Sequence, residues 1–207
     1  MVTASEIDTI IFDLDGTITE PFFDFDAIRQ DMGLSPDAGP ILELMETMTE
    51  EQRSHAQAVL DRHEKLGIEQ SKLNEGAQNT LEKLRNAGIN LAILTRNSGL
   101  NAKAVIDKHG LAFDQIVSRD DGPVKPDPFG VRLICERFST TPERTLVVGD
   151  FLYDLQSAKA AGATAVLIKT HKDAEDFCTH ADISIDSLAE LLDIIEKTNF
   201  DNEANCN

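Results

Sequence analysis

Two aspartates separated by one residue follow a short apolar run near the N-terminus. Ile10–Phe12 leads directly into Asp13, and Asp15-Gly16-Thr17 comes one residue later. The apolar run predicts a buried strand, and Asp15-Gly16 predicts a sharp turn at its end. Two carboxylates this close together, at the end of a buried strand, need a cation if both are to stay ionised. The segment therefore indicates a metal site, a carboxylate nucleophile and an acid/base partner.

A second polar segment, Thr95-Arg96-Asn97, follows another apolar run at 89–94. Thr95 alone has an ordinary explanation as a residue that precedes a helix cap. Its hydroxyl can also donate to a phosphate oxygen, with the backbone N–H groups of Arg96 and Asn97 beside it. Arg96 and Asn97 are therefore the preferred candidates for further substrate contacts.

Two more segments supply a cation and further carboxylates. Lys125 lies in a loop that Pro126 and Pro128 stiffen, within an otherwise very acidic chain. Asp150 ends an apolar run, and Asp154 follows four residues later. Taken singly, Lys125 could be a solvated lysine and Asp154 a helix cap. All four segments nevertheless fall near the C-terminal ends of successive predicted strands, where open parallel sheets bind ligands.

Elements that alternate between strand and helix position these side chains. Strands are predicted at 89–94, 115–118, 145–148, 164–168 and 181–185, and helices at 75–87, 100–109, 127–138, 155–161 and 188–197. Such alternation is typical of βαβ units, so we expect an α/β fold whose parallel sheet has helices on both faces.

The part between the first strand and the second breaks this pattern and contains no predicted strand. Helices are expected at 25–32, from residue 35 onward, and from a capping box at Thr49 to about Leu66, where Gly67 follows. We therefore predict a core of residues 1–20 and 74–198, a helical cap of residues 21–73 that serves as a lid, and a flexible tail at 199–207.

Composition limits the possible partners and location. The chain has 207 residues, 41% of them hydrophobic, which suits one domain with a small insertion. A net charge of −18 argues against nucleic acid or an anionic membrane as a partner. There is no apolar stretch of membrane-spanning length and no secretory signal, so a cytoplasmic location is expected. Cys135, Cys178 and Cys206 are widely spaced and predict neither a disulfide framework nor a zinc site.

Together the four segments resemble the signature of the haloacid dehalogenase-like hydrolase superfamily. That signature is a DxDGT segment, a Thr or Ser after the second core strand, a Lys often followed by Pro-Asp-Pro, and a GDxxxD segment. This chain is similar in every part and in the same order, from about Thr9 to Ile185. The resemblance is nearest to the branch with a helical cap after the first strand, which includes phosphoglycolate phosphatase-like enzymes. It implies a Rossmann-like core and a small phosphorylated metabolite as the substrate.

The resemblance also implies a role for each matching residue. Asp13 is expected to be the nucleophile and Asp15 the general acid/base. Thr95 and Lys125 are expected to hold the phosphate oxygens.

A metal site is implied as well. The expected Mg²⁺ ligands are Asp13, the main-chain carbonyl of Asp15, and Asp150, with Asp154 as a supporting carboxylate. Oxygen ligands of this kind are those that Mg²⁺ prefers.

Three activities stay open at this point. A Mg²⁺-dependent phosphatase is favoured, because the predicted cap is small beside those of phosphomutases, which share the same core residues. A receiver-like signalling domain that keeps phosphate on Asp13 is disfavoured, since receivers lack the DxDGT pair and the inserted cap. Dehalogenation is disfavoured by Asp15, because dehalogenases lack an acid/base carboxylate at that position.

Overall fold

The computed structural model describes residues 7–203 of the chain, and the side chains of residues 7–197. It divides into two compact units. One, here called the core unit, comprises Met1–Pro21 and Lys72–Asn207, and the other, the helical unit, comprises Phe22–Ser71. The boundaries predicted from the sequence lie at 20/21 and 73/74.

The core unit is built on a six-stranded parallel sheet, which confirms the predicted α/β, Rossmann-like fold class. The strands are β1 Thr9–Phe12, β2 Asn90–Leu94, β3 Gln115–Val117, β4 Thr145–Gly149, β5 Thr164–Ile168 and β6 Ile183–Ile185. Their order across the sheet is β3-β2-β1-β4-β5-β6.

Strand β1 lies in the interior of this sheet and pairs with both β2 and β4. Phe12 is opposite Ile93 on one side and Val148 on the other. All four residues of β1 are fully buried, as expected for a parallel strand covered on both faces. The strand order reverses at β1, and such a switch point opens a crevice beyond the C-terminal ends of the strands.

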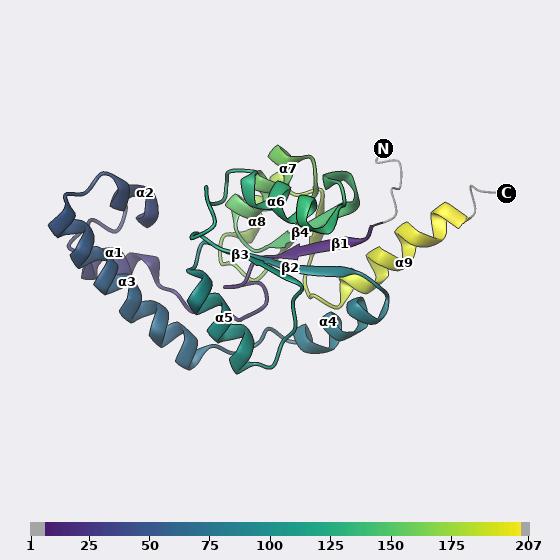
Figure 1. Cartoon of the computed structure of the whole chain (residues 1–207), viewed down its shortest axis with the longest axis horizontal. Coiled ribbons are helices and arrows are strands. Elements are labelled where there is room, and N and C mark those ends of the chain that lie inside the picture. The colour runs from purple at the N-terminus through teal and green to yellow at the C-terminus, as the bar shows by residue number, and fades with distance from the viewer. Residues whose placement is uncertain (1–6, 204–207) are drawn as a thin grey trace. The chain divides into compact units, whose positions relative to one another are not determined.

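Helices cover the two faces of the sheet (Figure 1). On one face, α6 Phe129–Phe138 and α7 Leu152–Ala161 pack against each other. On the other, α4 Ala77–Asn86 packs against α9 Glu190–Glu203, and α5 Gly99–Lys108 contacts β3. The hydrophobic core under α6 and α7 joins Val131, Ile134 and Leu155 to Ile11 and Val147 of the central strands.

Two parts of the core unit differ from the predicted elements. A short helix, α8 Ala174–Phe177, lies between β5 and β6, where the sequence shows no helical periodicity over a useful length. Helix α9 continues to Glu203, into the range 199–207 for which the sequence predicts a flexible tail.

The helical unit contains α1 Phe25–Asp31, α2 Ile41–Glu46 and α3 Glu50–Gln70. Its own apolar core includes Ile28, Met45, Val59 and Leu60. The predicted capping box at the start of α3 is present, with Thr49 and Gln52 bonded reciprocally.

Two predicted boundaries in the helical unit are wrong. The second helix begins at Ile41 rather than near Ser35, because Gly39 adopts a left-handed φ of 107° and Pro40 caps the helix. Helix α3 does not stop before Gly67 but passes through it. A Cβ at Gly67 would lie 2.7 Å from the Phe23 ring, so this glycine permits close packing inside the unit rather than ending the helix.

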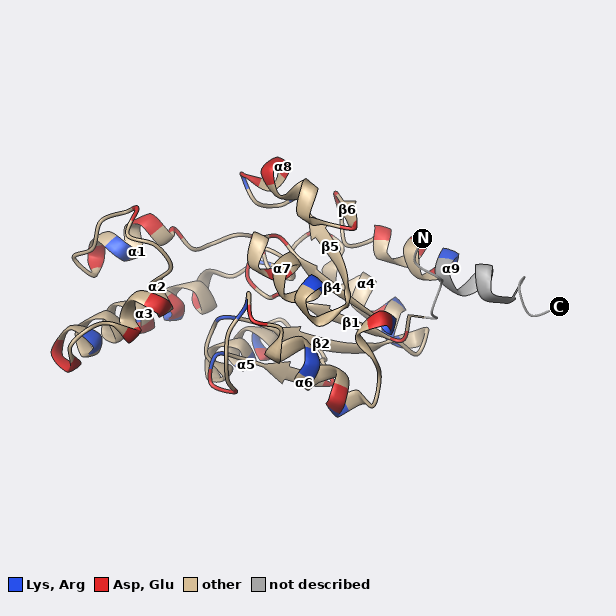
Figure 2. Ribbon diagram, turned by 90° about the horizontal axis from the view of Figure 1, so that it is seen from above, with Lys and Arg blue, Asp and Glu red and all other residues tan. Residues whose placement is uncertain are grey.

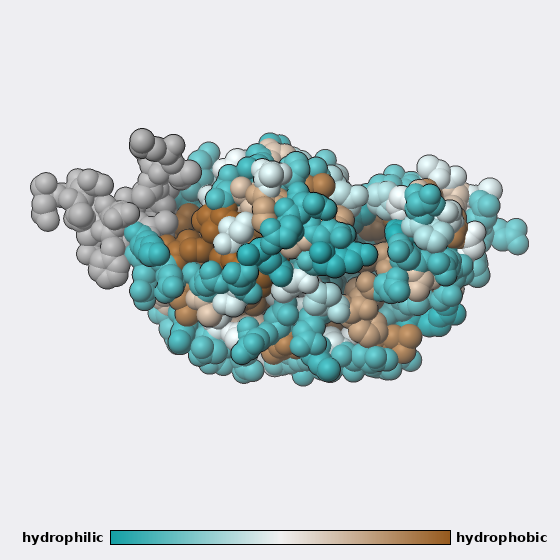
Figure 3. Space-filling model, turned by 180° about the vertical axis from the view of Figure 1, so that it is seen from behind, coloured by the Kyte–Doolittle hydropathy of each residue, from teal (hydrophilic) through white to brown (hydrophobic). Residues whose placement is uncertain are grey.

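Acidic residues, red in Figure 2, are spread along the helices and loops of both units. Hydrophilic side chains cover most of the face seen in Figure 3, and hydrophobic ones gather in a few separate areas. None of the helices in the described part of the chain is long and apolar enough to cross a membrane.

Candidate active site

Three predicted site residues lie at the C-terminal ends of three neighbouring strands. Asp13 follows β1, Thr95 follows β2 and Asp150 follows β4. Because β1 pairs with both β2 and β4, these positions share one edge of the sheet. The Asp13 N–H donates to the Val148 carbonyl oxygen at 2.9 Å, which continues the β1–β4 ladder up to the site. Strand pairing therefore assembles residues that are far apart in the sequence.

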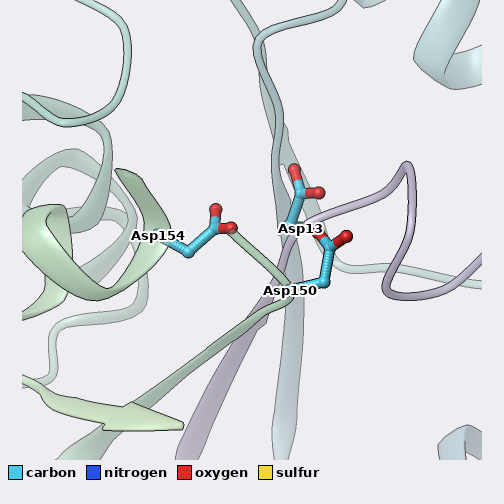
Figure 4. A group of neighbouring side chains, drawn as sticks. All are labelled: Asp13, Asp150 and Asp154. Atoms are coloured by element: carbon cyan, nitrogen blue, oxygen red, sulfur yellow. The ribbon is translucent and has the colours of Figure 1, made fainter. Parts of the chain in front are cut away.

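The side chains of Asp13, Asp150 and Asp154 form a carboxylate cluster (Figure 4). One carboxylate oxygen from each residue lies within 4.8 Å of the others. Asp154 comes from the first turn of α7, where its Oδ2 accepts the Phe151 N–H at 3.1 Å. A Cβ at Gly149 would lie 2.1 Å from Asp154 Cγ, so only glycine leaves room for the cluster.

Lys125 brings one positive charge into this cluster. Its Nζ donates to Asp13 Oδ1 at 2.5 Å and to Asp154 Oδ1 at 2.6 Å. The lysine side chain is 4% exposed, against 12% for Asp13 and 4% for Asp154. The Arg96 guanidinium donates to the Lys125 carbonyl oxygen and so fixes the loop that carries the lysine.

Burial and mutual repulsion shift the protonation of the cluster. Burial, offset in part by Lys125 and reinforced by Asp154 and Asp15, raises the pKa of Asp13 to about 7. Burial together with the charges of Asp13 and Asp154 raises the pKa of Asp150 to about 8. Burial favours the neutral amine of Lys125, but Asp13 and Asp154 outweigh it and raise the pKa of the lysine above its usual value.

The donor set fits a hard divalent cation. Three buried carboxylates face a single ammonium group, so one more positive charge would relieve the excess of negative charge. All the donors in the cluster are oxygens, the ligand type that hard cations select over nitrogen or sulfur.

Asp15 lies beside this cluster without joining it. Its carboxylate Oδ2 accepts from the Asn97 side-chain amide at 3.4 Å, and the cluster found among the described residues contains Asp13, Asp150 and Asp154. The turn after Asp15 is tight: Gly16 has a φ of 92°, and a Cβ there would lie 2.2 Å from Asp150 Oδ2. The predicted metal contact of Asp15, through its main-chain carbonyl, stays a prediction.

The three residues predicted to contact substrate after β2 have different surroundings. Thr95 is buried, and its Oγ1 accepts the Asn97 N–H at 3.0 Å. Asn97 is also buried and reaches Asp15. Arg96 instead lies over the Tyr153 ring, with its Cζ 5.0 Å from the ring centroid, and bonds to Lys125. Thr95 and Asn97 therefore lie on the Asp15 side, whereas Arg96 supports the lysine loop.

Sequence reasoning missed two residues that hold the turn after Asp15. The Asn74 side-chain amide donates to the carbonyl oxygens of Gly16, Thr17 and Thr19. Thr170 Oγ1 donates to the Gly16 carbonyl oxygen at 2.6 Å. Neither residue belongs to a recognisable motif, so no local signal in the sequence could have identified them.

Basic side chains of the helical unit are mostly engaged within that unit. Arg29 donates to the carbonyl oxygens of Pro36 and Gly39, and both Arg62 and His63 bond to Asp31. These contacts tie Arg29, Arg62 and His63 to their own unit.

Comparison with known proteins gives a consistent result. A family model described as haloacid dehalogenase-like hydrolase matches residues 7–162. The chain is 29% identical to an uncharacterized hydrolase of Saccharomyces cerevisiae over 202 residues, which cover 93% of each chain. It is 27% identical to a phosphoglycolate phosphatase of Vibrio vulnificus over 224 residues, covering 94% of this chain and 98% of that protein.

A solved structure shares the fold. The crystal structure of a hydrolase from Pseudomonas syringae aligns with a TM-score of 0.79 at 20% identity, covering 92% of this chain and 98% of the other.

Proposed function

The chain belongs to the haloacid dehalogenase-like hydrolase family, and on that premise we propose that it is a Mg²⁺-dependent phosphatase that hydrolyses a small phosphomonoester through an aspartyl-phosphate at Asp13. The observation that carries this proposal is the convergence of Lys125 with three buried carboxylates at the end of β1. Such a site can hold a doubly charged cation and a doubly charged phosphate next to each other.

The metal would be held by Asp13 and Asp150, with the main-chain carbonyl of Asp15 as a further ligand and Asp154 in support. When bound, Mg²⁺ supplies positive charge that keeps the carboxylates ionised and lowers the repulsion between carboxylate and phosphate.

In the first step, a carboxylate oxygen of Asp13 attacks phosphorus as the bond from phosphorus to the leaving oxygen breaks. Asp15 donates its proton to that oxygen, so the alcohol leaves neutral. Lys125 orients Asp13 through its hydrogen bond of 2.5 Å, and its charge offsets that of the transferred group. Thr95 donates its hydroxyl to a phosphate oxygen.

In the second step, water attacks the same phosphorus and the bond to the Asp13 oxygen breaks. The ionised Asp15 accepts the proton from water and is ready for the next cycle. The products are the alcohol and inorganic phosphate, and Asp13 is regenerated. A covalent intermediate divides one difficult displacement into two easier ones.

We propose a small phosphorylated metabolite as the substrate. The relative from Vibrio vulnificus is named for phosphoglycolate, which makes that compound one candidate among several. We propose that the helical unit acts as a lid that excludes water other than the attacking one.

A panel of metabolite phosphomonoesters tests this function, assayed with Mg²⁺ and again with EDTA. We expect release of inorganic phosphate from at least one member with Mg²⁺ and loss of that release with EDTA. Full activity in metal-stripped protein would exclude the proposed mechanism.

Assays of the same protein distinguish a phosphatase from the two alternative activities. A phosphomutase would transfer the phosphoryl group only with a bisphosphate activator and release little free phosphate. A receiver-like protein would keep phosphate on Asp13 for minutes, whereas turnover limits the lifetime of the intermediate to seconds or less.

A further inference from the structure

We propose that Asn74 is a positioning residue for catalysis, because it clamps the turn that carries Asp15 and isolates it from movement of the helical unit. This inference rests on the proposed acid/base role of Asp15, and it assigns a function to a residue outside every motif of the site.

The Asn74 amide spans the whole turn. Its Nδ2 lies 3.1 Å from the Gly16 carbonyl oxygen, 2.7 Å from that of Thr17 and 3.1 Å from that of Thr19. A side-chain amide offers two N–H donors, so these carbonyls share them. One side chain thereby fixes the directions of three of the peptide groups between Gly16 and Glu20.

The clamp adds to hydrogen bonds that the turn makes within itself, where the Gly16 N–H donates to the Thr19 carbonyl at 3.0 Å and the Ile18 and Thr19 N–H groups donate to the Leu14 carbonyl. Gly16 adopts a φ of 92°, and a glycine has more backbone freedom than any other residue. The same glycine packs against Asp150, so rotation of its peptide groups would disturb Asp15 on one side and a cluster carboxylate on the other. Thr170, two residues beyond β5, donates to the Gly16 carbonyl, and Asn74 donates to that carbonyl and to those of Thr17 and Thr19.

Asn74 also belongs to the stem that connects the two units. Thr19 and Leu73 form an antiparallel bridge, the Glu20 N–H donates to the Lys72 carbonyl at 2.9 Å, and the Asn74 N–H donates to the Ile18 carbonyl at 3.0 Å. The two chain segments that connect the units are therefore paired to each other up to the boundary of the core unit, at Pro21 and Lys72.

This pairing determines where movement can occur. We expect movement of the helical unit to use dihedrals outside the paired stem, near Pro21–Phe22 and Ser71–Lys72. Because Asn74 links the stem to three carbonyls of the turn, Asp15 keeps its place whatever the position of the helical unit.

The test compares Asn74→Ala with Asn79→Ala, which removes an exposed amide from α4 a short distance away. Both variants are assayed as Mg²⁺-loaded enzymes on aryl phosphates whose leaving groups differ in pKa. Poor leaving groups require the proton from Asp15, whereas good ones leave without it. We expect Asn74→Ala to lose kcat on the order of 10²-fold with phenyl phosphate and only a few-fold with dinitrophenyl phosphate, with KM nearly unchanged. Asn79→Ala should match the wild type.

A second measurement needs no activity. Hydrogen exchange of residues 14–20 should accelerate in Asn74→Ala and stay unchanged in Asn79→Ala, because the clamp holds the hydrogen-bonded turn closed. If Asn74→Ala does not fold, Asn74→Asp serves instead, since it has nearly the same shape but lacks the donors.

The outcomes separate the two proposals. Equal losses on good and poor leaving groups, wild-type kinetics in Asn74→Asp, or unchanged exchange would each overturn the role of Asn74. Wild-type protein that hydrolyses no phosphomonoester would instead overturn the proposed function, while the exchange measurement would still decide whether Asn74 holds the turn.

Discussion

The two aspartates after β1 lie two positions apart yet have different surroundings. Asp13 is bonded to buried Lys125 and belongs to the carboxylate cluster, whereas Asp15 faces Asn97 outside it. These different surroundings support the proposed roles of Asp13 as the nucleophile and Asp15 as the general acid/base.

Substitution of each aspartate should give a different kinetic result. Asp13→Asn removes the attacking oxygen, so we expect no turnover on any substrate. Asp15→Asn should lower kcat by about 10²–10⁴-fold on alkyl phosphates and much less on nitrophenyl phosphate. Phosphate release from both kinds of substrate checks this, and near-normal rates in Asp13→Asn would remove the nucleophile assignment.

Lys125 should matter for stability as well as for catalysis. Lys125→Met leaves Asp13 and Asp154 buried without their cation, so we expect the free energy of unfolding to fall by about 3–5 kcal/mol in metal-free protein. Urea denaturation measures the change. Lys103→Met is the control, since Lys103 pairs with Asp107 on the surface and its side chain is 63% exposed. A surface pair contributes about 0–1 kcal/mol, so equal losses in both variants would contradict the prediction.

Sequence patterns located the residues of the cluster because each directly follows a strand or begins a helix. Asp13, Asp150 and Asp154 could be named in this way, and so could Lys125 between its prolines. Asn74 could not, because its contacts depend on the pairing of two strands that are separated by the whole helical unit. The support that Arg96 gives to the lysine loop was also beyond sequence reasoning, since it depends on a loop 29 residues away.

At the scale of elements, the sheet was the most predictable part. Runs such as 145–148 and 164–168 are short, apolar and separated by helical segments, so their type and order follow directly from periodicity. Glycines predicted the ends of helices less reliably than apolar runs predicted strands. Gly162 ends α7 as expected, whereas Gly67 lies inside α3 because the Phe23 ring needs the space. A glycine needed for packing and one that ends a helix look alike in a sequence.

One arginine joins two helices of the helical unit. Arg53 of α3 donates to the carbonyl oxygens of Met45, Glu46 and Met48 at 3.0–3.3 Å, at the end of α2 and just beyond it. We expect Arg53→Ala to lower the stability of this unit by roughly 1–2 kcal/mol, since these carbonyls lose their donors. Hydrogen exchange within 41–49 measures the change.

Arg62→Ala is the matched control for that experiment. Its guanidinium pairs with Asp31 on the surface, with the Arg62 side chain 59% exposed, so little change is expected. Faster exchange throughout the core unit in Arg53→Ala would show that the effect is not local.

At the scale of the whole molecule, the carboxylate cluster should make stability depend on both pH and metal. In metal-free protein, burial raises the pKa of Asp13 to about 7 and that of Asp150 to about 8, above the value near 4 of an unfolded aspartate. The folded state therefore binds these protons more tightly. Their contribution to stability is fully present below about pH 4 and is lost as the pH rises through about 7 to 8.

Added Mg²⁺ should reverse that loss, because it binds the ionised carboxylates. We expect the rise in Tm on adding Mg²⁺ to be small near about pH 5 and to grow towards about pH 9. Thermal unfolding at a series of pH values, with and without Mg²⁺, measures this rise. Asp150→Asn should show almost none of it, and a rise independent of pH in the wild type would contradict the assignment.

The net charge of −18 acts over the same molecule. An anionic substrate is repelled at long range by a body with so many acidic side chains, and salt screens that repulsion. The positive charge that attracts the substrate must therefore be local, and this is the role that we propose for Lys125 and a bound cation.

The paired stem between the units has an evolutionary consequence. Thr19 and Leu73 lie opposite each other as bridge partners, so their Cα atoms are about 5 Å apart, the separation that a two-residue hairpin spans. The segment 22–71 thus occupies the place of a simple turn. An insertion of another length or shape can be accepted there while its ends keep their spacing, so the helical unit can be exchanged without changing the strands that carry the carboxylate cluster.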